Sequence, residues 1–188
     1  MEPIRWGVGD PLEALVFDLL LLHAETPELP ANIADERMIH QVLNRDDLLA
    51  NEVLLRSFFG LLVHAHYRTT PTDLHRILDA PNVRLHALTH GEHVLAATMI
   101  AVEGTLEEKT CDDLYWGRCR VRGHALPETL ASHSGEREAG MLSIIRSVRI
   151  AVHPALRRRG LATRLIGHVH DTYQPDLFGT LFGLSSGL

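Results

Sequence analysis

Apolar residues recur at helical spacing in three stretches of the first 80 residues. The first stretch, residues 11–23, opens with Pro11, which suits the first turn of a helix. A longer apolar face follows over residues 45–65. Thr70 then precedes a proline and an acidic residue, the usual start of a short helix. The pattern predicts three helices, and it places the third over 71–79.

The apolar pattern changes to that of strands after residue 80. Residues 82–88 and 93–102 read as two strands, and the short polar turn 89–92 between them predicts an antiparallel hairpin. Residues 143–152 are rich in Ile and Val and predict a buried strand. A last short strand is expected over 177–182.

The remaining segments complete an α+β fold. Residues 105–118 are acidic and helical in pattern, whereas 122–127 reads as irregular. A final helix is predicted from one apolar face, made by Leu161, Leu165, Ile166 and Val169. This order of elements is typical of helices around a mixed sheet. We expect residues 1–30 to be a lead-in helix and linker, and residues 31–188 to form the domain.

Length and composition fit one globular domain. The chain has 188 residues, of which 45% are hydrophobic and 22% are charged. Apolar runs such as 19–22 are far shorter than the roughly 18 residues of a membrane span. The first residues lack the basic and apolar regions of a signal peptide. Cys111 and Cys119 form no metal or disulfide pattern, so we expect a cytoplasmic protein with free thiols and no membrane partner.

Charge is distributed unevenly along the chain. The net charge is −6, which by itself disfavours nucleic acid as a partner. Residues 115–164, however, hold ten arginines, no lysine and only three acids, a balance of +7 that leaves −13 for the rest. This asymmetry predicts an anion-attracting face on the C-terminal half. Salt-bridged surface arginines are the alternative interpretation.

The densest basic segment lies where a strand gives way to a helix. The strand ends before Pro154, three consecutive arginines follow at 157–159, and Gly160 and Ala162 open the helix. Gly160 allows a ligand to approach the backbone closely. Successive backbone N–H groups and the positive end of the helix stabilise a pyrophosphate. The segment therefore predicts a pyrophosphate site.

The same segment carries a resemblance to a known family. Arg157-x-x-Gly160-x-Ala162 matches the R/Q-x-x-G-x-G/A pattern of GNAT acetyltransferases, which bind acetyl-CoA. Further segments resemble the acetyltransferase domain of the tRNA(Met) cytidine acetyltransferase family, and they occur in the same order: 66–74, 78–82, 122–127, 148–154 and 177–183. Residues 4–15 resemble the stretch that leads into that domain.

The resemblance implies a GNAT-like mixed central sheet with flanking helices, incomplete at its C-terminal end. It also implies that this domain belongs to a larger enzyme with a helicase-like ATPase module and a tRNA-binding part. Such enzymes form N4-acetylcytidine at the wobble position of elongator tRNA(Met) from acetyl-CoA, with ATP hydrolysis. This chain has no G-x-x-x-x-G-K-[ST] loop, so it would not bind the ATP. Leu181 and residues 184–188 depart from the family pattern.

The resemblance also assigns the donor site. Strand-edge backbone groups would contact the pantetheine arm and the thioester, and the turn would hold the pyrophosphate. The residues assigned in this way are Ile150, Ala151 and Val152 for the arm, and Arg157, Arg158, Arg159, Gly160, Leu161, Ala162 and Thr163 for the pyrophosphate.

The acceptor side needs a base, because the exocyclic amine of cytosine is conjugated with its ring and is a poor nucleophile. His66 and Tyr67 lie between two predicted helices and are the catalytic candidates, although they could simply fill that junction. His124 and His153 are weaker candidates, and His153 is better explained as shaping the loop before Pro154. The other histidines lack ligand spacing, so no metal site is predicted.

Two alternatives remain open at the level of sequence. One is a GNAT enzyme that acetylates a small amine or a protein amine, which would share the turn but not explain the segments at His66 and Gly123. The other is a truncated, non-catalytic module that binds RNA or another partner through its arginine face.

Overall fold

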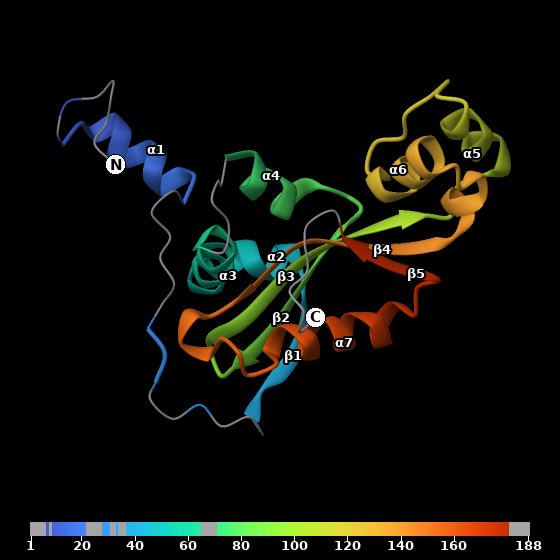
Figure 1. The fold of residues 1–188 in the computed structure, drawn as a ribbon. Coiled ribbons are helices and arrows are strands. Elements are labelled where there is room, and N and C mark those ends of the chain that lie inside the picture. The colour runs from blue at the N-terminus through green and yellow to red at the C-terminus, as the bar shows by residue number, and fades with distance from the viewer. Residues whose placement is uncertain are drawn as a thin grey trace.

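The computed structural model describes residues 7, 9–21, 28–30, 33, 37–64 and 71–180. Its centre is a five-stranded sheet with the strand order β1-β2-β3-β4-β5 (Figure 1). The strands are β1 (Ile39–Leu43), β2 (Val83–His90), β3 (His93–Gly104), β4 (Ser143–Val152) and β5 (Leu177–Thr180). Strands β1 to β4 pair antiparallel, and β5 pairs parallel to β4. The sheet is therefore mixed, as predicted.

Helices lie on both faces of the sheet (Figure 1). The described helices are α1 (Pro11–Leu19), α2 (Arg45–Ala50), α3 (Glu52–His64), α4 (Pro71–Asp79), α5 (Glu108–Tyr115), α6 (Ala125–Ser134) and α7 (Leu161–Tyr173), with short 3-10 turns η2 (Arg137–Met141) and η3 (Pro154–Leu156). Helices α3 and α4 pack on one face, and α7 packs on the other. Helices α5 and α6 form an appended unit beyond the ends of β3 and β4.

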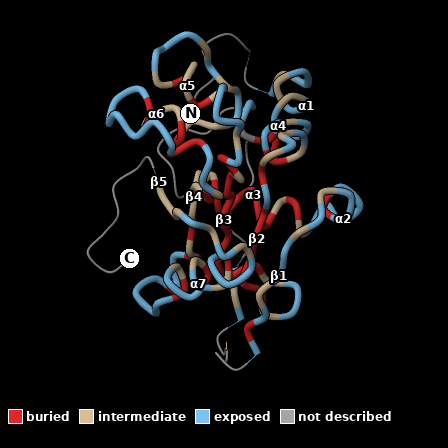
Figure 2. Tube along the Cα trace, turned by 90° about the vertical axis from the view of Figure 1, so that its right-hand side faces the viewer, coloured by how far each residue is buried: buried red, intermediate tan, exposed pale blue. Residues whose placement is uncertain are grey.

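Alternation of side chains along the strands supplies two cores, seen as the buried centre of Figure 2. On the α3 and α4 face, buried helix residues meet alternate positions of β2 and β3, and they include Phe58, Phe59, Leu62, Ile77, Leu85, Ala97 and Met99. On the α7 face, the packed residues include Leu88, Ala96, Leu161 and Leu165, followed by Ile100, Ile145 and Val169. The central strands β2, β3 and β4 are thus covered on both sides, whereas β1 is mostly exposed.

Several predicted elements are confirmed. The hairpin forms between β2 and β3, and the strand 143–152 and the helix 71–79 have the predicted bounds. The predicted helix 45–65 is wrong as a single element, because it is interrupted at Asn51. The side-chain Oδ1 of Asn51 accepts a hydrogen bond from Leu54 N at 3.0 Å, so this residue closes α2 and caps α3.

Other boundaries differ from the predictions. The segment 122–127 is not wholly irregular, because α6 begins at Ala125, and the predicted acidic helix is shorter at Glu108–Tyr115. Strand β1 was not predicted. Helix α1 ends at Leu19 and the described part of the last strand ends at Thr180, so residues 22–23 and 181–182 of the predicted elements lie outside the described residues.

The division at residue 30 stays a prediction. Leu21, which follows α1, is buried in the core formed by α3 and α4. Within the residues that the structure describes, no helix is both long and apolar enough to cross a membrane.

Candidate functional site: the open end of β4 and the turn into α7

Strand β4 is paired on both edges over only part of its length. It pairs with β3 from Ser143 to Val152, but with β5 only from Ile144 to Ser147. The register to β3 also shifts at this point, because Ile100 pairs with Ser147 whereas Met99 pairs with Arg149. One extra residue, Val148, is accommodated there as a bulge. Beyond it, the outer edge of β4 is paired with no strand in the described part of the chain.

The backbone groups of this open edge can be identified from the ladder. His153 N–H donates to Leu95 O at 2.9 Å, so His153 faces β3. Successive residues of a strand point their backbone groups in opposite directions. The N–H and C=O groups of Ile150 and Val152 therefore point away from β3, into the open edge. Those of Ala151 point towards β3, and its side chain is buried in the core.

The strand leads into a turn that is held by a side-chain hydrogen bond. The buried His153 accepts a hydrogen bond at Nδ1 from Ala155 N at 3.3 Å and caps η3. This contact agrees with its expected role in shaping the loop. Arg158 has a φ of 63° and Gly160 a φ of 74°, both in the left-handed region. Turns that contain left-handed residues direct backbone N–H groups into a common concavity that suits an anion.

Gly160 is the residue immediately before α7 and has no side chain to cap the helix. A Cβ atom built on Gly160 would meet no heavy atom within 4 Å, so the space in front of the helix is open. Leu161 is buried and anchors the first turn of the helix, whereas the arginines at 157–159 are exposed. The structure thus brings open space, exposed guanidinium groups and the positive end of a 13-residue helix together.

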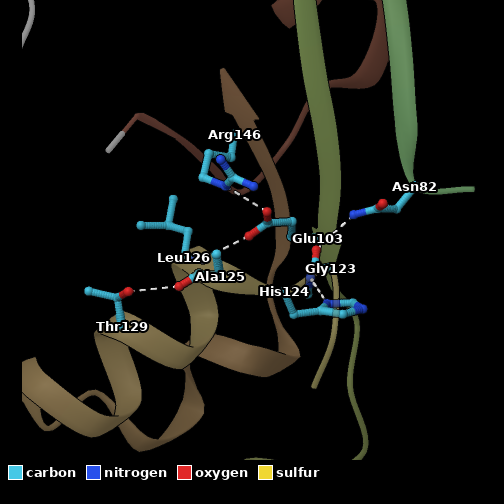
Figure 3. A network of polar contacts seen from close by, with 9 residues as sticks. Asn82, Glu103, Gly123, His124, Ala125, Leu126, Thr129 and Arg146 are labelled. Carbon is cyan, nitrogen blue, oxygen red and sulfur yellow. Dashed lines mark hydrogen bonds and ion pairs between the residues drawn. The ribbon is translucent and has the colours of Figure 1, made fainter. Parts of the chain in front are cut away.

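The two catalytic candidates, His66 and Tyr67, lie outside the described residues. Helix α3 ends at His64 and α4 begins at Pro71, so the described structure fixes the two elements on either side of them. The weaker candidate His124 has a structural contact: its Nδ1 accepts a hydrogen bond from Gly104 N at 2.9 Å (Figure 3).

Beside His124, a buried charged network joins β3, β4 and α6 (Figure 3). Glu103 accepts hydrogen bonds from Arg146 Nε at 2.6 Å and from Leu126 N at 2.8 Å. The Glu103 side chain is fully buried and that of Arg146 is 15% exposed. Since Leu126 is in the first turn of α6, the carboxylate also serves as the cap of that helix. This network holds the paired end of β4, and neither charge could be placed in it from the sequence.

A second polar cluster lies beneath α7. His40 Nε2 and His86 Nδ1 are 3.0 Å apart, and His86 Nε2 is 3.0 Å from the hydroxyl of Tyr173. The ring of His168 stacks on that of His40 at 4.7 Å. Burial, and secondarily His40, lower the pKa of His86 to about 4, and burial chiefly lowers the pKa of His40. The rings of His40 and His86 are therefore neutral at pH 7, and their contacts with His168 and Tyr173 fasten α7 to β1 and β2.

The histidine cluster was not predicted, because its residues lie far apart in sequence. The signal that could have indicated it is the alternation of side chains along β1 and β2, which places His40 and His86 on the same face of the sheet. The described part of the chain contains no group of three His, Cys, Asp or Glu side chains suited to a metal ion.

Comparison with known proteins identifies the family. The family model described as GNAT acetyltransferase 2 matches residues 57–180, a stretch that holds the open end of β4, the turn and α7. The chain belongs to this acetyltransferase family. A solved GNAT family acetyltransferase from Staphylococcus aureus is similar with a TM-score of 0.49 and 13% identity, over 81% of this chain and 91% of that one.

Curated relatives of high identity carry a more specific name. A protein named tRNA(Met) cytidine acetyltransferase TmcA from Haloferax volcanii is 44% identical over 191 residues, which cover 100% of this chain and 25% of that protein. A protein of the same name from Nitrosococcus halophilus is 44% identical over 166 residues, which cover 87% of this chain and 22% of that protein. The chain thus spans about a quarter of the length of the curated relatives that it matches.

Proposed function

We propose that this chain is the acetyltransferase domain of an enzyme that transfers an acetyl group from acetyl-CoA to the N4 amine of cytidine at the wobble position of elongator tRNA(Met). The observation that carries the proposal is the 44% identity, over the whole chain, to a protein named tRNA(Met) cytidine acetyltransferase. The open edge of β4 followed by an anion-binding turn supports it, because a long thioester with a pyrophosphate needs both.

On this proposal the donor lies along the open end of β4. Backbone groups of Ile150 and Val152 bind the pantetheine arm as an added strand would be bound. The pyrophosphate lies in front of Gly160, where backbone N–H groups, the helix end and the exposed arginines stabilise its charge. The turn is fixed by the His153 cap before any ligand binds, so little ordering is needed on binding.

The reaction places charge on the thioester oxygen. The N4 amine attacks the carbonyl carbon, a C–N bond forms, and the C–S bond then breaks to release the CoA thiolate. A backbone N–H at the open edge stabilises the oxygen while it is negative. The amine loses one proton to a base, for which His66 is the candidate with Tyr67 beside it, and a proton returned to the thiolate gives the CoA thiol.

The same proposal extends to the surroundings of the domain. The relatives are about four times as long as this chain, which supports further domains as partners. ATP would be bound by such a domain, because this sequence has no phosphate-binding Lys loop of the Walker type. Cys111 and Cys119 are free thiols, which supports the cytoplasm as the compartment.

The test is acetyl transfer by the purified chain with labelled acetyl-CoA and a tRNA(Met) transcript. Nuclease digestion of the product should yield N4-acetylcytidine. Acetylation of small amines or peptides, with none of tRNA, would replace the proposal by the general GNAT alternative. Salt-sensitive tRNA binding without any acetyl-CoA-dependent rise in the unfolding temperature would favour the non-catalytic module.

His66→Ala tests the acceptor side. If His66 is the base, acetyl transfer to tRNA should slow by about a hundredfold, the lower range for a general base, with the Kd of acetyl-CoA unchanged. His75→Ala is the matched control, because His75 is an exposed residue on α4. Wild-type turnover by the His66 variant would remove this residue from the mechanism.

A further inference from the structure

An exposed aromatic and basic surface lies on the appended unit, away from the donor site. It is formed by the 116–124 turn, which joins α5 to α6. Trp116 is 64% exposed, an unusual state for so large an apolar side chain. The ring of Tyr115 packs edge-on against it, with the centroids 5.1 Å apart. The indole is therefore held in place and also accessible.

Three arginines follow the tryptophan at every second position: Arg118, Arg120 and Arg122, with no acidic residue in the turn. Arg118 is 3.7 Å from Asp113 and Arg120 is 3.6 Å from Glu128, and these two arginine side chains are 67% and 89% exposed. Ion pairs this long and this exposed contribute little. Their guanidinium groups can therefore turn to a phosphate with little loss of stabilising free energy.

The backbone of the turn is fixed at both ends. At its start, Arg118 N donates to Asp113 O at 2.7 Å. At its end, Asn82 Nδ2 donates to Gly123 O at 2.7 Å, and Gly104 N donates to His124 (Figure 3). Gly123 has a φ of +85°, and a Cβ there would lie 2.9 Å from Asn82 Nδ2, so only glycine suits this contact. The surface is thus preorganised for binding.

The contact with Asn82 places the turn beside the segment that follows the C-terminal end of α4. Asn82 follows α4, and α4 directly follows the segment that holds His66 and Tyr67. In Figures 1 and 2 the α5–α6 unit and α4 lie at the same end of the molecule. The turn into α7 lies at the far end of β4, so the 116–124 turn is separate from the pyrophosphate site.

We infer that the 116–124 turn is a binding surface for single-stranded RNA. On the function proposed above, its occupant is the anticodon loop of the substrate tRNA. An unpaired base stacks on Trp116, and neighbouring phosphates contact Arg118, Arg120 and Arg122. Aromatic stacking is available only to unstacked bases, which loops have and duplexes lack. Guanidinium groups bind phosphate in a bidentate manner, which suits the use of arginine alone in this turn.

The experiment measures binding of the full chain to an RNA hairpin with the anticodon stem and loop of tRNA(Met), and to a duplex of the same stem without the loop. Trp116→Ala should weaken binding of the hairpin roughly tenfold. It should leave binding of the duplex unchanged. Each of Arg118→Gln, Arg120→Gln and Arg122→Gln should reduce the slope of log Kd against log salt by roughly 0.7.

Lys109→Ala is the matched control, because it removes an exposed positive charge from α5 in the same unit but outside the turn. The Kd of acetyl-CoA and the unfolding temperature should stay at wild-type values in every variant. Hairpin binding by the wild type that is unaffected in the Trp116 and arginine variants would overturn this inference and leave the proposed function intact. No binding or acetylation of any RNA by the wild type would overturn both. Equal loss with the hairpin and the duplex would reduce the turn to a non-specific basic patch and would also overturn the inference.

Discussion

The two ends of β4 differ in how many of their hydrogen-bonding groups are paired with the rest of the molecule. From Ile144 to Ser147 the strand is paired on both edges, and Arg146 forms a buried ion pair with Glu103. Beyond the bulge at Val148 it is paired on one edge and continues into a turn with two left-handed residues. One strand thus has a closed end and an open end.

The difference shows how a single strand can be fixed at one end and leave backbone groups accessible at the other, where we propose that the donor binds. At the closed end, β5, the Glu103 carboxylate and α6 take up the hydrogen-bonding capacity around Arg146. At the open end, the backbone groups of Ile150 and Val152 lack a neighbouring strand in the described part of the chain. The closed end fixes the position of the open one, so a ligand meets groups that are already in place.

The largest effect is expected at the closed end. Glu103→Ala leaves a largely buried guanidinium unpaired and removes the acceptor for Leu126 N, so the free energy of unfolding should fall by about 3 kcal/mol. Denaturant unfolding measures it. Glu138→Ala, at an exposed position, is the control and should change stability by less than about 0.5 kcal/mol. A similar small change for the Glu103 variant would show that the ion pair does not stabilise this end.

At the open end, Gly160→Glu should weaken acetyl-CoA binding by about a hundredfold or more, because it places bulk and negative charge where we propose that the pyrophosphate lies. The fold should survive, since the new side chain meets open space and only the φ of +74° is unfavourable. Calorimetric titration with acetyl-CoA measures the loss. Unchanged affinity would remove the donor site from this turn.

The attachment of α7 to the sheet should depend on pH. Neutral His86 is required in the folded state, where burial lowers its pKa to about 4 from 6.5. Its contribution to stability is full above pH 6.5 and is lost as pH falls towards 4. The pKa shift corresponds to a loss of about 2 kcal/mol between pH 8 and pH 5.

Denaturant unfolding of the wild type and of His86→Gln at pH 8 and pH 5 isolates the contribution of His86 to this loss of stability. The remaining groups that face His86 are His40 and Tyr173, with His168 stacked on His40, and the variant keeps them. An equal loss of stability in both proteins would assign the acid sensitivity to other groups.

The smallest effect is expected from a variant that distinguishes the contribution of the turn's backbone from that of its side chains. Arg158 has a φ of 63°, so Arg158→Gly should raise the free energy of unfolding by about 1 kcal/mol. Because backbone N–H groups and two further arginines remain, acetyl-CoA affinity should fall by less than about tenfold. Thermal unfolding measures the change in stability, and calorimetric titration measures the change in acetyl-CoA affinity. A loss as large as that of Gly160→Glu would show that the Arg158 guanidinium holds the pyrophosphate.

Local patterns were good predictors where the signal is local. Strand 143–152 and helix 71–79 were predicted with their observed bounds, because a run of β-branched residues and a proline start act within a few residues. The break at Asn51 and the start of α6 at Ala125 were missed. Asn51 caps through its own side chain, and α6 is capped by a glutamate from another strand, so neither boundary has a simple local pattern.

The candidate site divides in the same way. The turn at 157–163 could be located from the sequence because its three arginines, Gly160 and the start of the helix are consecutive. That it binds a pyrophosphate stays a prediction. Which of its neighbours present free backbone groups could not be predicted, and Ala151 proved to face β3. The roles of His66 and Tyr67 stay predictions.

The sequence by itself determined the hairpin, the strand 143–152, the helix 71–79, the arginine-rich turn before α7 and the family to which they point, because each is recorded in short runs of consecutive residues. Only the tertiary structure decided where β4 loses its second neighbour, which charges are buried with Glu103, and which histidines meet beneath α7. These depend on strand register and on side chains from distant segments. The physical reason is that burial and pairing are properties of the packed sheet, and no local pattern records which edge stays open.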